Sequence, residues 1–216
     1  MKGELSMNMA AFKEFIKFPF YVMVRPFTAF EDIKYGERGS KKYIIVSILL
    51  MWVAIAFNTQ YAGIVVNENN PMTMNSISDL YGVIAVFVLW CVGNWSITSL
   101  MDGEGKLIQI ATATSYALTP FFLGYFVATL LSRFITTQEV AFYTMIITIV
   151  TIWAAFLLFA AVATIHNFSF VKALATIFFS FVSMIIIIFL IMLIGALLQQ
   201  VFFFFENVYK ELTYRI

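Results

Sequence analysis

The stretch ALATIFFSFVSMIIIIFLIMLIGALLQQVFFFF, residues 173–205, contains no Asp, Glu, Lys or Arg. A run of about 18 or more apolar residues is long enough to cross a bilayer as a helix. Four further uncharged runs precede it, at residues 43–66, 80–101, 107–132 and 140–165. All 12 acidic and all 13 basic residues lie outside these five runs. The sequence therefore predicts an all-α integral membrane protein with five transmembrane helices.

The composition supports one compact membrane domain. Of the 216 residues, 62% are hydrophobic and 12% are charged, whereas soluble domains carry about 25% charged residues. We expect a cytoplasmic basic arm at residues 1–42, the five-span domain at 43–205 and a short polar tail at 206–216. The single cysteine, Cys91, lies inside the second span and can form no internal disulfide. The N-terminus lacks the apolar core of a cleaved signal peptide.

The basic residues predict which end of the chain faces the cytoplasm. Residues 1–42 hold eight Lys and Arg, and the first connecting loop, residues 67–79, holds none. With a cytoplasmic N-terminus, ten basic residues lie on the inner side and three on the outer side. The positive-inside rule therefore favours a cytoplasmic N-terminus in the cell membrane, or in an endomembrane if the source is eukaryotic.

The fifth run is too long for a simple span. Its 33 residues would form a helix of about 50 Å, whereas the hydrocarbon core is about 30 Å thick. Either this helix tilts and protrudes, or Gln199-Gln200 marks the interface and residues 201–205 lie along the headgroups. We favour the second arrangement because a Phe run beside Glu206 and Tyr209 suits an interfacial belt.

The N-terminal arm alternates aromatic and basic residues. Phe12, Phe15 and Ile16 share one helical face, and Pro26 can begin a second helix because the first helical position needs no N–H donor. We interpret the arm as two short amphipathic helices on the inner membrane surface, which anchor the first span, dock a partner or sense lipids. The candidate residues for contact with the membrane surface or a partner are Lys13, Lys17, Arg25, Phe27, Phe30, Lys34, Lys41 and Lys42.

The second and third spans carry most of the polar side chains found inside the uncharged runs. Such residues usually form hydrogen bonds between helices, and Pro120 should bend the third span near its middle. We expect a packed, bent helical hairpin, with a hydrated cavity as the alternative. The candidate packing or cavity residues are Asn94, Trp95, Thr98, Tyr116 and Pro120.

The sequence contains no recognisable catalytic set. Gly103 and Gly105 lie in a short charged turn that lacks the phosphate-loop spacing, and Asp102 with Glu104 offers too few oxygens for a hard cation. His166 is the only histidine and has no carboxylate beside it in the sequence. We therefore predict no enzyme, no cofactor and no metal.

The order of these motifs resembles the Ypt-interacting protein (Yip) domain family in its compact prokaryotic form. The resemblance rests on Pro26-Phe27-x-x-Phe30-x-x-Ile33 in the arm, Trp90 and Trp95 in the second span, and Tyr116-Ala117-Leu118-Thr119-Pro120 in the third. It covers roughly residues 18–200 and implies a five-span helical fold with a cytoplasmic N-terminus. Eukaryotic relatives are associated with vesicle transport and with prenylated Rab-type GTPases. Their cytosolic region is far longer than this arm, which argues against binding of a small GTPase here.

Three functions fit the sequence. The first is a non-enzymatic scaffold or accessory subunit that binds another membrane protein or a second copy, in some relatives beside a transport system. The second is a small transporter or channel for a neutral solute, lined by the second and third spans. The third is a lipid-handling or membrane-shaping protein. The lipid bilayer is the one partner common to all three, and nothing in the sequence indicates a nucleic acid.

Overall fold

The computed structural model describes residues 2–36, 38–67 and 75–214, with side chains from Lys13 onward. This part of the chain is helical, without a strand. The elements are α1 (Lys2–Val24), α2 (Pro26–Tyr35), α3 (Tyr43–Tyr61), α4 (Ser76–Leu100), α5 (Leu107–Ala117), α6 (Thr119–Leu131), η2 (Thr137–Glu139), α7 (Val140–His166) and α8 (Phe170–Tyr214).

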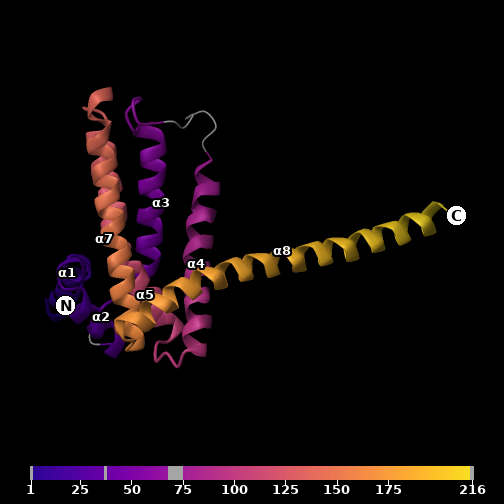
Figure 1. Cartoon of the computed structure of the whole chain (residues 1–216), viewed down its shortest axis with the longest axis horizontal. Helices are drawn as coiled ribbons and strands as arrows, with labels where there is room; N and C mark the ends of the chain where they lie inside the picture. Colours follow the sequence, from indigo (N-terminus) through magenta and orange to yellow (C-terminus); the bar gives the residue numbers. More distant parts are fainter. Residues whose placement is uncertain (1, 37, 68–74, 215–216) are drawn as a thin grey trace.

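Three long helices run side by side and form the body of the molecule (Figure 1). These are α3, α4 and α7, and α5 and α6 pack against both α3 and α7. The arm helices α1 and α2 lie beside the lower part of α7, at the end of the bundle where α8 also begins (Figure 1). Five stretches are long and apolar enough to cross a membrane, namely Tyr43–Tyr61, Ser76–Leu100, Leu107–Leu131, Thr137–His166 and Phe170–Tyr214. The predicted five-span helical class is confirmed.

The local sequence explains where several helices begin and end. Pro26 opens α2 as predicted, and Gly36 ends it in the left-handed conformation at φ 75°. The side chain of Asn75 caps α4 by accepting a hydrogen bond from Ser78 N at 3.2 Å. The third span is broken into α5 and α6 at Leu118, because Pro120 in the first turn of α6 has no N–H to donate.

Two predicted boundaries need correction. The first span ends at Tyr61 rather than at residue 66, since Ala62 is extended and Gly63 N donates instead to Ser132 Oγ at 2.8 Å. The arm does not consist of two short helices, because α1 extends over 23 residues.

The last helix departs most from the bundle. α8 is an uninterrupted helix of 45 residues, about 67 Å long by helical rise. It crosses the lower half of α4 and then extends obliquely away from the bundle (Figure 1). Its buried residues are confined to its first third and are Ala173, Thr176, Ser180 and Ser183. The helix continues without a break through Gln199-Gln200 to Tyr214. Where the membrane interface lies along it stays a prediction.

Candidate functional site

The arm is held to the bundle by a cluster of aromatic rings. Tyr43 on α3 and Tyr116 on α5 stack with their ring centroids 4.1 Å apart, and Phe18 of α1 meets Tyr116 edge-on at 5.0 Å. Phe18, Val22 and Phe30 are at most 1% exposed. One side of each arm helix is thus covered by protein and belongs to the core.

Arg38 lies at the edge of this aromatic cluster, on the side that the sequence predicts to face the cytoplasm. Its guanidinium pairs with Glu14 of α1 and lies 3.6 Å from Asp32 of α2. It also lies over the rings of Phe18 and Tyr21, at 5.3 and 4.8 Å from their centroids. The hydrogen bond to Glu14 raises the pKa of Arg38 above its ordinary value. We call these five residues the Arg38 cluster; they join α1, α2 and the segment before α3.

The predicted docking residues separate into buried and exposed groups. Phe30 is fully buried in the core, so it cannot contact a membrane surface or partner in this arrangement. Phe27 is 48% exposed and Lys34 is half-buried. The remaining predicted cations are exposed and have no ion pair with a described acid; they are Lys13, Lys17, Arg25, Lys41 and Lys42.

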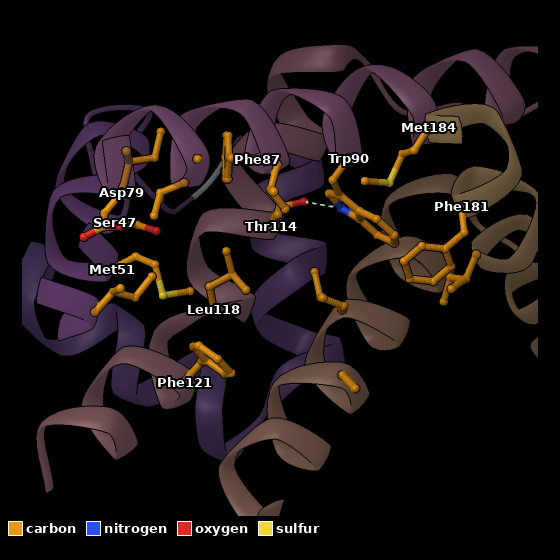
Figure 2. Close-up of a pocket in the computed structure, with 18 of the residues that line it drawn as sticks. Ser47, Met51, Asp79, Phe87, Trp90, Thr114, Leu118, Phe121, Phe181 and Met184 are labelled. Atoms are coloured by element: carbon orange, nitrogen blue, oxygen red, sulfur yellow. Dashed lines mark hydrogen bonds between the residues drawn. The ribbon is translucent and has the colours of Figure 1, made fainter. Parts of the chain in front are cut away.

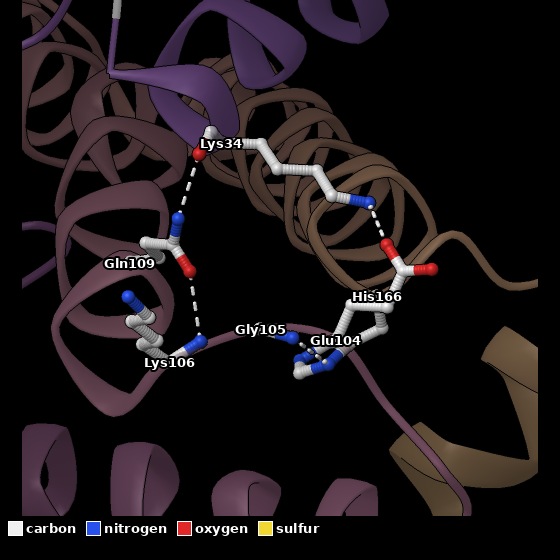
Figure 3. A network of polar contacts seen from close by, with 6 residues as sticks. All are labelled: Lys34, Glu104, Gly105, Lys106, Gln109 and His166. Carbon is white, nitrogen blue, oxygen red and sulfur yellow. Dashed lines mark hydrogen bonds and ion pairs between the residues drawn. The ribbon is translucent and has the colours of Figure 1, made fainter.

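A polar network joins α2 to the loop before α5 (Figure 3). Lys34 Nζ lies 2.6 Å from Glu104 Oε2, and Gln109 Nε2 donates to the Lys34 carbonyl at 2.7 Å. Lys106 N donates to Gln109 Oε1 at 2.8 Å, which caps α5. The hydrogen bond from Lys34 is the main cause that lowers the pKa of Glu104 below its ordinary value.

The Gly103–Gly105 turn packs directly on His166 at the end of α7. Gly105 N donates to His166 Nδ1 at 3.2 Å, so Nδ1 is the acceptor and Nε2 carries the ring proton (Figure 3). A Cβ on Gly103 would lie 2.6 Å from Nδ1, and one on Gly105 would lie 2.6 Å from Cε1. The glycines therefore serve close packing as well as the predicted turn.

The candidate residues of the second and third spans are mostly packed. Asn94 is fully buried and donates from Nδ2 to Ser180 Oγ of α8 at 3.1 Å, whereas Thr98 donates to the Trp95 carbonyl at 3.1 Å. Trp95 itself is 44% exposed. Tyr116 belongs to the aromatic cluster and its hydroxyl accepts from Ser40 N at 3.0 Å, while Pro120 is buried in the break between α5 and α6. These contacts support helix packing, and the hydrated cavity remains an untested alternative.

The structure contains a groove of about 680 Å³ that was not predicted from the sequence (Figure 2). Its walls come from α3, α4 and α7, its floor from α5 and α6, and one end from α8. The lining is almost wholly apolar, and the Trp90 Nε1 donor is already bound to Thr114 Oγ1 at 3.1 Å. Among the residues that the structure describes, Asp79 is the one charged residue that lines it. The sequence does contain a signal for this groove. One face of α4 carries lining residues at helical spacing, namely Asp79, Gly82, Val83, Val86, Phe87 and Trp90.

Comparison with models of known protein families identifies the family of this chain. The Yip1 domain model matches residues 20–204. The chain belongs to the Yip1 domain family. Neither the comparison with functionally described proteins nor the comparison with solved structures gave a match.

Most of the features described above lie within the residues that the Yip1 domain model matches. The groove, the Gly103–Gly105 turn and Arg38 all lie within the matched residues, as does α2. Of the α1 residues that contact Arg38, Glu14 and Phe18 lie before the match and Tyr21 lies within it. The family resemblance drawn from the sequence is confirmed. The Yip1 domain is not a known enzyme family, so its membership supplies no reaction to search for in the groove.

Proposed function

We propose that this Yip1 domain protein is a non-enzymatic scaffold or accessory subunit that holds a second membrane protein, or a second copy of itself, along α8. One observation carries the proposal. No residue of α8 between Met184 and Tyr214 is buried, although this part of the helix is about 46 Å long by helical rise. Its charge-free part, residues 184–205, is about 33 Å long, so this helix offers a partner an uncovered apolar surface across the full hydrocarbon core.

The polar residues of this segment strengthen the proposal. Gln199 and Gln200 lie near the end of the apolar run of α8, before residues 201–205, and neither amide has a hydrogen-bond partner in the described part of the chain. Amide side chains hydrogen-bond between helices in bilayers, and small residues allow close approach of two backbones. Gly195 lies one turn before Gln199 on the same face, and a Cβ there would meet nothing within 4 Å. This face offers the contacts that a partner helix uses.

The other functions inferred from the sequence receive less support. Asn94, Thr98 and Tyr116 lie in packed surroundings, which favours a structural role over a solute path. We also propose that the arm faces the cytoplasm in the cell membrane, on the strength of its basic residues, and that the exposed cations Lys41 and Lys42 contact anionic headgroups.

Site-specific photo-crosslinking in the native host tests the scaffold proposal. A benzophenone amino acid at Ile188 of α8 should give discrete adducts. The same probe at Phe142 of α7 serves as the control because that side chain is also exposed, at 64% against 43% for Ile188. Co-expression of two differently tagged copies separates self-association from a different partner. Replacing Gln199 and Gln200 together by Leu should weaken the adducts at Ile188. Adducts that are absent at Ile188, or no more discrete than those at Phe142, would refute the proposal.

A further inference from the structure

The groove of Figure 2 extends through only part of a membrane span. On α4 its lining runs from Ser78 to Trp90, a separation of about 18 Å by helical rise. The hydrocarbon core is about 30 Å thick, so this length is close to that of one leaflet. α8 closes the inner end with Phe181 and Met184, and the Phe181 ring lies 5.6 Å from that of Trp90.

This closure selects among possible occupants. A transmembrane helix of another chain needs about 20 residues and would have to pass the level of Phe181, where α8 blocks the groove. A lipid tail inserted from one leaflet ends where the groove ends. The groove therefore fits a chain molecule of single-leaflet length better than a spanning helix.

The outer end of the groove is polar, in contrast to its apolar lining elsewhere. Asp79 lies in the first turn of α4, where the helix N-terminus favours a negative charge. No described cation forms an ion pair with its carboxylate. On the α3 wall, the Ser47 hydroxyl is buried and has no partner among the described residues, although it can donate to an ester oxygen. A ligand with a cationic group at the mouth would pair with Asp79, and a hydrogen-bond acceptor below that group would accept from the Ser47 hydroxyl.

We propose that the groove binds one phospholipid with an ammonium headgroup, taken from the leaflet distant from the arm. One tail fills the apolar groove between α3, α4 and α7, and the ammonium group pairs with Asp79. The volume of about 680 Å³ lies within the range of about 300–1,000 Å³ typical of small-molecule sites. This inference does not depend on the scaffold proposal, because the groove and the distal part of α8 are separate surfaces.

Gly82 allows the groove to be filled without disturbing the fold. It lines the groove in the middle of the α4 face, and a Cβ at this position meets nothing within 4 Å. Gly82→Phe therefore places a ring in the space assigned to the tail. Ala85→Phe is the matched control, because Ala85 is also an exposed small residue of α4 but does not line the groove.

Native mass spectrometry of the full-length protein in detergent tests the site. The delipidated protein is titrated with dioleoyl phosphatidylethanolamine, and separately with the phosphatidylglycerol of the same tails. We expect one retained phosphatidylethanolamine, at least about tenfold weaker retention in Gly82→Phe, and no change in Ala85→Phe. Asp79→Asn should weaken binding of phosphatidylethanolamine by about two- to fivefold, the range of an exposed ion pair, and abolish the preference over phosphatidylglycerol. Asp102→Asn controls for loss of a carboxylate elsewhere.

Circular dichroism and size-exclusion elution verify that each variant is folded before its binding is compared. Equal retention in Gly82→Phe and the unmodified protein would overturn the groove as the site. Loss of binding in Gly82→Phe with an unchanged headgroup preference in Asp79→Asn would overturn the role of Asp79. A protein dimer that Gly82→Phe dissociates, with no effect on lipid, would show that the groove takes a second copy instead.

Discussion

Replacing Arg38 by Gln should release α1 from the bundle. The guanidinium makes two ion pairs, with Glu14 and Asp32, and lies over the rings of Phe18 and Tyr21. Exposed ion pairs contribute about 0.2–1 kcal/mol each and exposed cation–π contacts about 0.5–1 kcal/mol each. Since Arg38 is 38% exposed and neighbouring contacts are not additive, we expect a total near 1.5–3 kcal/mol.

The free energy of local opening can be measured by thiol labelling. Val22 of α1 is fully buried, so a cysteine placed there in a Cys91→Ser background reacts only when α1 opens. When opening and reclosing are fast compared with labelling, the labelling rate is proportional to the open population. A loss of 1.5–3 kcal/mol corresponds to labelling that is about 10- to 150-fold faster.

The control variant is Arg25→Gln. Arg25 is an exposed cation of the same arm without an ion pair to a described acid, and its loss should leave the rate within about twofold of the parent. High salt should narrow the difference between Arg38→Gln and the parent, because the Debye length falls to about 3 Å at 1 M. If Arg38→Gln labels no faster than Arg25→Gln, Arg38 does not hold the arm.

Three further predictions concern stability and accessibility. Glu104→Gln should lower the melting temperature only at pH values where Glu104 is ionised in the parent protein. The hydrogen bond from Lys34 lowers the pKa of Glu104, so the stabilisation by this pair is present above the ordinary value of 4.5 and is lost as the pH falls through the lowered pKa. Melting curves of both proteins from pH 3 to 8 test this. Leu157→Ala, at a fully buried position, should cost about 2–5 kcal/mol in reversible unfolding, whereas Ile186→Ala, 52% exposed on α8, should cost far less. Cys91 is 4% exposed and should react with a hydrophilic maleimide only after unfolding, so rapid labelling of the folded protein would favour the hydrated-cavity alternative.

Local chain chemistry was predictable because it depends on single residues. Pro120 had to interrupt the third span, since it lacks the N–H that continues a helix, and Pro26 was suited to start one. The five spans followed from the placement of charge alone. The side chain of Phe30 was harder to place, because an apolar helical face looks the same in the sequence whether it meets lipid or protein.

The burial of the arm required a partner surface that no local pattern reveals. Tyr43 and Tyr116 are 73 residues apart, and their stacking creates the surface on which Phe18 lies. The sequence shows three aromatic residues without indicating that they meet. Long-range contacts of this kind determine that the arm belongs to the core and that Tyr116 is a packing residue.

The groove was hidden for a different physical reason. In water, an unfilled apolar groove is costly, so an apolar face in a sequence indicates a protein contact. In a bilayer, lipid tails are as apolar as leucine, and the same face can contact protein or lipid at similar free energy. Hydropathy therefore locates α4 as a span but does not indicate which side is left open. That information comes from the open space around Gly82 and from Asp79 at the end of the same face, and these are the residues through which the lipid site can be tested.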